Sequence, residues 1–350
     1  MIPEVPGELP SERPDGLSRR EVLAYTAAFG SAFLAAQGLA AEGPAGGAAA
    51  ASAAARKPPA KRYAMKKSIN LWALPYPQKM TLKECFELCK DAGFEGVEVN
   101  FAEEGELSPQ TTAAELKAIG AMARTIGVEI SGLCSFLFWP YALSHEDPKR
   151  REKGIAVAAA MIRAAPLLGT ENVLIVPGAV YIPWMPDEPP VPFEVCDRRA
   201  RDAVRRLIPE AEKARAYLNI ENIFINGFLH SPQEMIDFVD SFRSDRVQVH
   251  FDTGNIAQYH FPEHWIPLLG KRIKNTHLKE YSKRVHEFNL HTFRPLLDGT
   301  TDWPAVLEAL DQVGYRGYLT FEYFNPLPHW PEALVYHTSD ALDRMLGRKA

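Results

Sequence analysis

The strongest constraint on this sequence is the regular alternation of short apolar runs with amphipathic segments from residue 66 onward. Eight runs have the length and composition of strands, and these lie at residues 69–73, 96–101, 128–135, 172–177, 218–223, 247–251, 273–278 and 318–324. Alternation of this kind favours a parallel sheet covered by helices and argues against a sandwich or a helical bundle. Eight units over about 280 residues are the size of one (β/α)8 TIM barrel, which we predict for residues 66–350.

A doubly wound sheet is the alternative fold. That fold would bind a dinucleotide through a Gly-x-Gly-x-x-Gly turn after the first strand, and the sequence has none there. The chain also has neither a P-loop nor a Gly-x-Ser-x-Gly elbow. The motifs therefore give no support to a nucleotide site or a serine hydrolase.

Several helix ends are marked by capping residues. Thr81 and Glu84 have the spacing of a capping box, and Ser231 precedes another predicted helix. Gly127 and Gly169 follow helical segments at the position where a left-handed residue ends a helix. These signals predict helices that begin near residues 82 and 232 and end near 126 and 168.

The N-terminal segment has the composition of a targeting signal. Arg19 and Arg20 precede a weakly apolar stretch over residues 22–36, a pattern that resembles a twin-arginine export signal. That stretch is too short to span a membrane, which takes about 20 apolar residues. We predict that residues 1–41 direct export, that no stable membrane span remains after cleavage, and that the protein is periplasmic or extracytoplasmic. An ordinary amphipathic helix is the alternative. Residues 42–65 are rich in Ala, Gly and Pro and are predicted to be a linker.

The composition excludes some partners. The net charge of −5 argues against a nucleic-acid ligand, for which a basic surface would be expected. The four cysteines, Cys85, Cys89, Cys134 and Cys196, are too few and too scattered for a disulfide framework. Cys85 and Cys89 share one face of a predicted helix, and we interpret them as buried thiols.

Four residues with metal-binding side chains lie at the ends of four successive predicted strands: Glu221, Asp252, His277 and Glu322. In a parallel barrel, the carboxyl ends of the strands face the active site. Adjacent strands are about 4.8 Å apart, so these four side chains can reach one ion. Three carboxylates and one imidazole suit Mn²⁺, Mg²⁺, Co²⁺, Zn²⁺ or Fe²⁺.

The residues around these four positions resemble the xylose-isomerase-like TIM-barrel superfamily, which includes sugar phosphate isomerases and epimerases. The similar motifs are Ile220-Glu221-Asn222, Asp252-Thr253-Gly254-Asn255, His277-Leu278-Lys279-Glu280 and Phe321-Glu322. The resemblance implies an isomerase or epimerase for a small carbohydrate, with one divalent metal ion, Mn²⁺ first among the candidates. It also implies that the ion stabilises an ene-diolate while Glu221 and Glu322 exchange a proton as base and acid.

Further residues are weaker candidates for contact with substrate. Glu98 at the end of the second strand would bind hydroxyl groups, and Asn255 stands where many ketose 3-epimerases have a histidine. Lys279 shares a strand face with His277 and would hold a substrate oxygen. Trp72 would stack against a sugar ring. Arg294 would meet a phosphate if the substrate carried one.

Two other functions use the same residues. A lyase or dehydratase acting on keto-sugars or 3-keto-glycosides would share the metal and the base but would expel a leaving group, giving an unsaturated product. A non-catalytic, exported carbohydrate-binding barrel would bind sugar without turnover. Assembly into a homo-oligomer is a further expectation that the sequence leaves open.

Overall fold

The computed structural model describes residues 61–284 and 292–349 of the chain. The predicted export signal and most of the predicted linker lie outside the described residues. Residues 61–65, which the composition placed at the end of the linker, already contact the barrel. The Tyr63 amide donates to the Leu346 carbonyl at 3.1 Å, and Met65 is fully buried.

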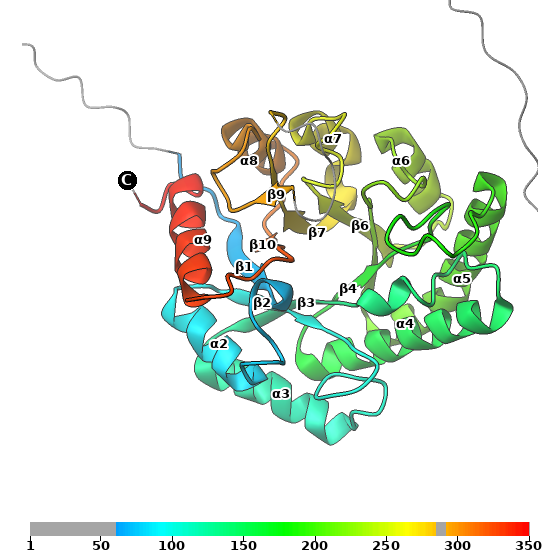
Figure 1. Ribbon diagram of the computed structural model, residues 1–350, viewed down its shortest axis with the longest axis horizontal. Coiled ribbons are helices and arrows are strands. Elements are labelled where there is room, and N and C mark those ends of the chain that lie inside the picture. The colour runs from blue at the N-terminus through cyan, green and yellow to red at the C-terminus, as the bar shows by residue number, and fades with distance from the viewer. Residues whose placement is uncertain (1–60, 285–291, 350) are drawn as a thin grey trace, which may run out of the picture. The chain divides into compact units, whose positions relative to one another are not determined.

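Eight parallel strands form a closed barrel in the order β1-β10-β7-β6-β5-β4-β3-β2 (Figure 1), which confirms the predicted TIM barrel. The strands are β1 (Lys66–Asn70), β2 (Gly96–Asn100), β3 (Glu129–Cys134), β4 (Asn172–Ile175), β5 (Tyr217–Glu221), β6 (Val247–Asp252), β7 (Ile273–Leu278) and β10 (Tyr318–Phe321).

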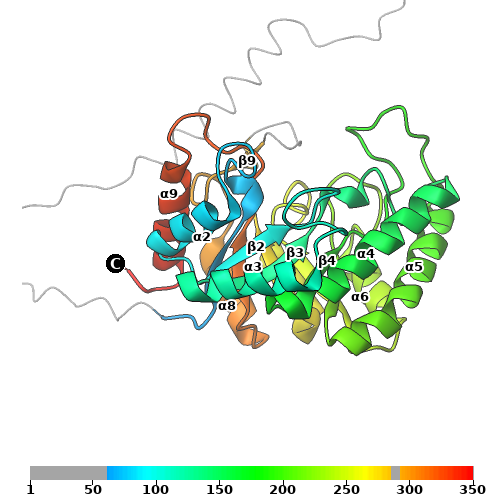
Figure 2. The ribbon, with the colours of Figure 1, turned by 90° about the horizontal axis from the view of Figure 1, so that it is seen from below.

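Helices surround the strands (Figures 1 and 2). They are α2 (Leu82–Asp91), α3 (Ala113–Ile126), α4 (Pro148–Leu168), α5 (Phe193–Ala214), α6 (Pro232–Asp240), α7 (Pro262–Leu269), α8 (Trp303–Gln312) and α9 (Glu332–Met345). Short 3-10 turns are η1 (Leu71–Ala73), η2 (Phe136–Phe138) and η3 (Gly270–Arg272). None of the helices in the described part of the chain is both long and apolar enough to cross a membrane.

The predicted helix ends are confirmed where the capping residues marked them. Thr81 and Glu84 form a reciprocal capping box at the start of α2, and Ser231 caps α6 in the same way. Gly127 and Gly169 end α3 and α4 with φ of 94° and 92°, a conformation that favours glycine.

The barrel interior contains several buried polar side chains. Buried polar residues occupy alternate positions on several strands: Ser68 and Asn70, Asn219 and Glu221, His250 and Asp252, and Asn275 and His277. Side chains two residues apart share a face of a strand. Hydrogen bonds between different strands, such as Ser68 Oγ to Ser131 Oγ at 2.7 Å, place this face inside the barrel. A column of polar side chains therefore leads to the carboxyl ends of the strands.

A small hairpin that the sequence did not predict follows β7. It pairs β8 (Glu280–Tyr281) with β9 (Phe293–Arg294) in antiparallel register. The Glu280 carboxylate accepts hydrogen bonds from Trp303 Nε1 at 2.6 Å and from the Leu297 and Thr301 amides at 3.2 Å each. This buried carboxylate therefore ties the segment after β7 to the start of α8.

Candidate metal centre

The four candidate ligands come from four barrel strands or their ends. Glu221 ends β5, Asp252 ends β6, His277 lies in β7, and Glu322 directly follows β10. The register pairs Asp252 with His277 directly across neighbouring strands. Each residue offers one donor atom, and all four atoms lie within 4.8 Å of one another. The structure thus brings together all four residues that the sequence singled out.

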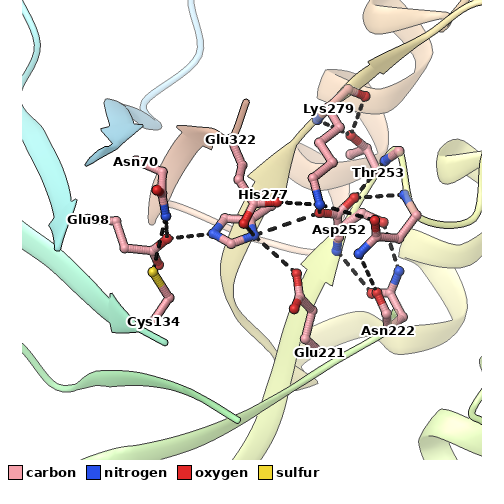
Figure 3. Close-up of polar contacts among 12 residues, drawn as sticks. Asn70, Glu98, Cys134, Glu221, Asn222, Asp252, Thr253, His277, Lys279 and Glu322 are labelled. Atoms are coloured by element: carbon pink, nitrogen blue, oxygen red, sulfur yellow. Dashed lines mark hydrogen bonds and ion pairs between the residues drawn. The ribbon is translucent and has the colours of Figure 1, made fainter. Parts of the chain in front are cut away.

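His277 lies at the centre of this cluster (Figure 3). Its Nδ1 atom is 3.1 Å from Glu221 Oε1, 3.3 Å from Glu322 Oε1 and 3.7 Å from Asp252 Oδ2. All four residues are buried, with at most 5% of any of them exposed. Charged groups of one sign are seldom buried together unless a cation or a proton compensates them.

The orientation of Asp252 is fixed by the backbone around it. Its Oδ1 accepts hydrogen bonds from the Gly254 and Asn255 amides, both at 2.8 Å. The Asn222 side chain brackets the Asp252 backbone, accepting from its amide at 2.9 Å and donating to its carbonyl at 2.8 Å. Oδ2 is therefore the oxygen that faces the cluster.

The donor set fits a divalent cation. Oxygen atoms from three carboxylates and one ring nitrogen converge from four strands, and each type of atom is a common ligand of Mn²⁺, Co²⁺, Zn²⁺ and Fe²⁺. Glu221, Asp252, His277 and Glu322 would hold the ion. The set does not select one metal, because the same ligands serve several divalent cations.

The proton affinities of the cluster reflect its burial and its charges. Burial raises the pKa of Glu221 to about 7, and the neighbouring His277 ring partly offsets this rise. Burial likewise raises the pKa of Glu322 above its ordinary value. For His277, burial opposes the charged form, but the Glu322 and Glu98 carboxylates hold its pKa well above the ordinary value. Without a cation, the cluster therefore retains protons.

Lys279 is the cation closest to these carboxylates. Its Nζ lies 2.9 Å from Asp252 Oδ2, contacts Glu322 Oε2, and donates to Asn255 Oδ1 at 3.1 Å. Burial disfavours its charge, but Asp252 and Glu322 raise the pKa of Lys279 above its ordinary value. Lys279 and Asn255, both expected near the substrate, do line the pocket beside the cluster.

Aromatic side chains form the walls of that pocket. On one side, the Trp72 ring lies 4.5 Å from Phe136 and 5.3 Å from Phe324, measured between ring centroids. On another, Trp184 lies 4.7 Å from Trp139 and 5.5 Å from Phe224. Trp72, a predicted stacking residue, therefore lines the pocket together with five aromatic rings from other loops.

Two predicted substrate contacts occupy other places. Glu98 is fully buried in β2 and does not line the pocket, because its Oε2 atom lies 2.5 Å from His277 Nε2. Arg294 lies in the hairpin strand β9, where its side chain is 43% exposed and 4.0 Å from Asp298. Neither side chain is among the residues that line the pocket.

The sequence reasoning did not single out several residues of this site. Asn222, Phe136, Phe224 and Phe324 all follow barrel strands, as Trp72 does, and this shared position is a signal that could have identified them. Asn70 was missed as well, although it is the last residue of β1. Its hydrogen bond to Glu98 on the neighbouring strand β2 depends on the register between β1 and β2.

Comparisons with known proteins place these features in a family. A D-psicose 3-epimerase from Enterocloster bolteae is 24% identical over 220 residues, which cover 58% of this chain and 67% of that protein. The structure of an L-ribulose 3-epimerase superposes with a TM-score of 0.67 at 18% identity, covering 81% of this chain and 96% of that one.

A 3-keto-D-glucoside 4-epimerase from E. coli gives a TM-score of 0.63 at 16% identity, covering 80% of this chain and 99% of that structure. At identities below 20%, these structural similarities show a shared fold only. Residues 86–344 match the family model described as xylose isomerase-like TIM barrel. The chain therefore belongs to the xylose isomerase-like TIM barrel family.

Proposed function

We propose that the protein is a divalent-metal-dependent epimerase or isomerase that moves a proton on the carbon next to the carbonyl group of a small sugar. The observation that carries this proposal is that Glu221 and Glu322 both line one pocket and both belong to the cluster of candidate metal ligands. The epimerases of psicose, ribulose and a 3-keto-glucoside among the similar proteins support it.

Two carboxyl groups suit this chemistry. A general base or acid works best when its pKa lies near the working pH, and in the metal-free protein burial raises the pKa values of both Glu221 and Glu322 above the ordinary value. Glu221 and Glu322 come from β5 and the end of β10, which are separated in the barrel by β6 and β7. One carboxylate would remove the proton, and the other would return one to the opposite face of the same carbon. Return to the neighbouring carbon would instead give isomerisation.

A bound divalent cation would supply Lewis-acid polarisation of the sugar carbonyl group. The protein itself would orient the sugar. Lys279 Nζ faces the pocket from beside Glu322, and an ammonium group there would hold a substrate oxygen as it gains negative charge. The aromatic walls would stack on the apolar faces of the ring.

The charges in the pocket favour a sugar without a phosphate group. Among the described residues that line the pocket, Lys279 is the one basic side chain, and it is already shared between Asp252 and Glu322. Glu221 and Glu322 add acidic groups. A phosphate would need an arginine or an uncommitted lysine to compensate its charge. We therefore propose an uncharged ketose or keto-glycoside as the substrate.

Deuterium incorporation tests this function. The full-length protein, loaded with Mn²⁺, is incubated in D₂O with ketohexoses, ketopentoses, a 3-keto-glucoside and their phosphorylated counterparts. The proposal expects deuterium on the carbon next to the carbonyl group of a sugar that lacks phosphate, together with an inverted centre or a moved carbonyl. A new ultraviolet absorbance would identify a lyase instead. Sugar binding without deuterium incorporation would leave a carbohydrate-binding barrel and contradict the proposal.

Export remains a second part of the proposal and rests on Arg19 and Arg20. Free sugars and glycosides occur outside the cell, so an extracytoplasmic location would agree with a substrate that lacks phosphate. Cell fractionation tests this, because replacing both arginines with lysine should retain the protein in the cytoplasm if the twin-arginine route is used. Export of the doubly substituted protein would contradict it.

A further inference from the structure

The imidazole ring of His277 has a buried partner on the side that faces away from Asp252 and Lys279 (Figure 3). Its Nε2 atom lies 2.5 Å from Glu98 Oε2, and neither side chain has more than 1% of its surface exposed. Glu98 belongs to β2, which is separated from β7 in the barrel by β1 and β10. The contact therefore passes through the barrel interior and connects the metal cluster to a strand that is not a neighbour of β7.

The direction of this hydrogen bond follows from Asn70. The Oδ1 atom of Asn70 accepts a hydrogen bond from the Trp72 amide at 2.8 Å, which fixes the orientation of the side-chain amide. Its Nδ2 then donates to Glu98 Oε2 at 2.6 Å. The same carboxylate oxygen thus serves as an acceptor towards Asn70, and a carboxylate accepts from His277 Nε2–H as well.

The tautomer of His277 determines which nitrogen can bind a metal. A neutral imidazole carries one N–H and one free lone pair. With the hydrogen on Nε2, the lone pair belongs to Nδ1, and this is the nitrogen that faces Glu221, Asp252 and Glu322. Histidine ligands of metals commonly donate their other N–H to a carboxylate, which orients the ring and strengthens the ligand.

We propose that Glu98, held by Asn70, is a positioning residue that fixes His277 as the Nε2–H tautomer with Nδ1 directed into the metal cluster. This inference rests on the metal site of the proposed function. It assigns Glu98 to the support of a ligand and not to the binding of substrate hydroxyl groups, for which the sequence made it a weaker candidate. It also assigns a function to Asn70, whose side chain would otherwise only cap η1.

A different use of the same residues gives different expectations. Glu98, His250 and His277 also offer donor atoms within 4.8 Å of one another, and the His250 ring lies 4.0 Å from that of His277 between centroids. His277 Nε2 could join Glu98 and His250 as a ligand of a second ion only if it gave up its hydrogen bond to Glu98 Oε2. A count of bound metal ions distinguishes the two arrangements.

The test compares the full-length wild-type protein with Glu98→Ala and Glu98→Gln. Mn²⁺ binding is titrated to give both affinity and stoichiometry. The positioning role predicts one ion in every protein, an affinity about 10- to 100-fold lower in Glu98→Ala, and a smaller loss in Glu98→Gln, whose amide oxygen can still accept a hydrogen bond. The matched control is Glu103→Gln, because Glu103 is exposed and its carboxylate pairs with Lys153 away from the cluster. This variant should bind Mn²⁺ with the affinity of the wild type.

A second measurement reads the tautomer without relying on activity. In ¹⁵N-histidine-labelled protein loaded with diamagnetic Zn²⁺, His277 should show a slowly exchanging proton on Nε2 and a metal-shifted Nδ1. That proton should exchange faster in Glu98→Ala. If Glu98→Ala fails to fold, Glu98→Gln still reports the tautomer, because the substitution preserves the shape of the side chain.

Three results separate failure of this inference from failure of the proposed function. Absence of metal binding by the wild type would remove the metal site itself. Wild-type binding with unchanged affinity in Glu98→Ala, or with the proton on Nδ1, would overturn the positioning role alone. If the wild type binds two metal ions and Glu98→Ala binds one, Glu98 is itself a ligand, and this result would also overturn the positioning role.

Discussion

Lys279 Nζ lies 2.9 Å from Asp252 Oδ2, so a buried cation already occupies one side of the carboxylate cluster that would hold a metal. The same ammonium contacts Glu322. Lys279 and a bound metal ion would therefore interact with the same two carboxylates, Asp252 and Glu322. The arrangement keeps the four acidic and imidazole ligands compatible with burial, and it places a positive charge where a sugar oxygen would lie.

Replacing Lys279 with methionine should therefore have opposite effects on metal binding and on turnover. Removal of the charge relieves its repulsion of a divalent cation, so affinity for Mn²⁺ should rise by about tenfold or more. Turnover should fall, because the ammonium no longer holds the substrate oxygen. Calorimetric titration and rate measurements at saturating metal check this. Weaker metal binding in the variant would show that Lys279 orders the ligands and does not compete with the ion.

Conservative substitution of either glutamate should abolish the proton transfer. We expect Glu221→Gln and Glu322→Gln to lower kcat by about 10²- to 10⁴-fold at saturating Mn²⁺, since an amide cannot take up the proton. Deuterium incorporation measures the rate directly. Asp252→Ala is the comparison, because its main effect should be lower metal content. Full activity in either glutamine variant would contradict the two-carboxylate mechanism.

Metal affinity should depend steeply on pH near neutrality. In the metal-free protein, the pKa of Glu221 is raised to about 7 and that of His277 lies well above its ordinary value. Both groups must lose their protons before they can bind an ion, so affinity rises as pH rises through these pKa values and falls as pH is lowered. Between pH 8 and pH 6 we expect a loss of at least about tenfold.

Proton release during titration provides the readout for this pH dependence. Calorimetry in buffers of different ionisation enthalpy should detect protons released on Mn²⁺ binding at pH 6.5, and fewer of them in Glu221→Gln. An affinity that stays constant from pH 6 to pH 8 without proton release would show that the cluster is already fully ionised.

Much of this site could be predicted from single residues in their local context. Glu221, Asp252, His277 and Glu322 each follow an apolar run, and the barrel fold places the ends of such runs at one face. The two-residue periodicity of strands also predicts that Ser68 and Asn70 share one face, and in the structure this face lines the barrel interior. Local sequence patterns thus identify the side chains that lie at the carboxyl ends of the strands.

The pairing of Glu98 with His277 could not be predicted in this way. It depends on how high each residue lies in the barrel, and a shift occurs in the pairing of β2 with β3 between Val97 and Glu98. A register irregularity of this kind leaves no clear mark in the sequence. The hairpin β8–β9 was missed for a related reason, since two-residue strands are too short to show any period.

The four cysteines should not react with alkylating reagents while the protein is folded. All four are buried and free. Burial raises the pKa of Cys85 and of Cys196 to about 12, and it raises those of Cys89 and Cys134 well above the ordinary value. Because the thiolate is the reactive form, an alkylating reagent at pH 8 should leave the native protein unmodified and label four sites in denaturant. Mass spectrometry counts the labels, and rapid native labelling of Cys85 or Cys89 would point to a reactive pair.

Removal of the Trp72 ring should weaken substrate binding more than it slows catalysis. Trp72 lines the pocket and is supported by Phe136 and Phe324 at centroid distances of 4.5 and 5.3 Å, so the indole is held in place before substrate arrives. Loss of its stacking contact with a sugar ring should raise KM roughly tenfold in Trp72→Ala, while kcat changes less. The control is Trp330→Ala, because Trp330 is 75% exposed and does not line the pocket. A drop in kcat at constant KM would instead assign Trp72 to the alignment of the reacting carbon with Glu221 or Glu322.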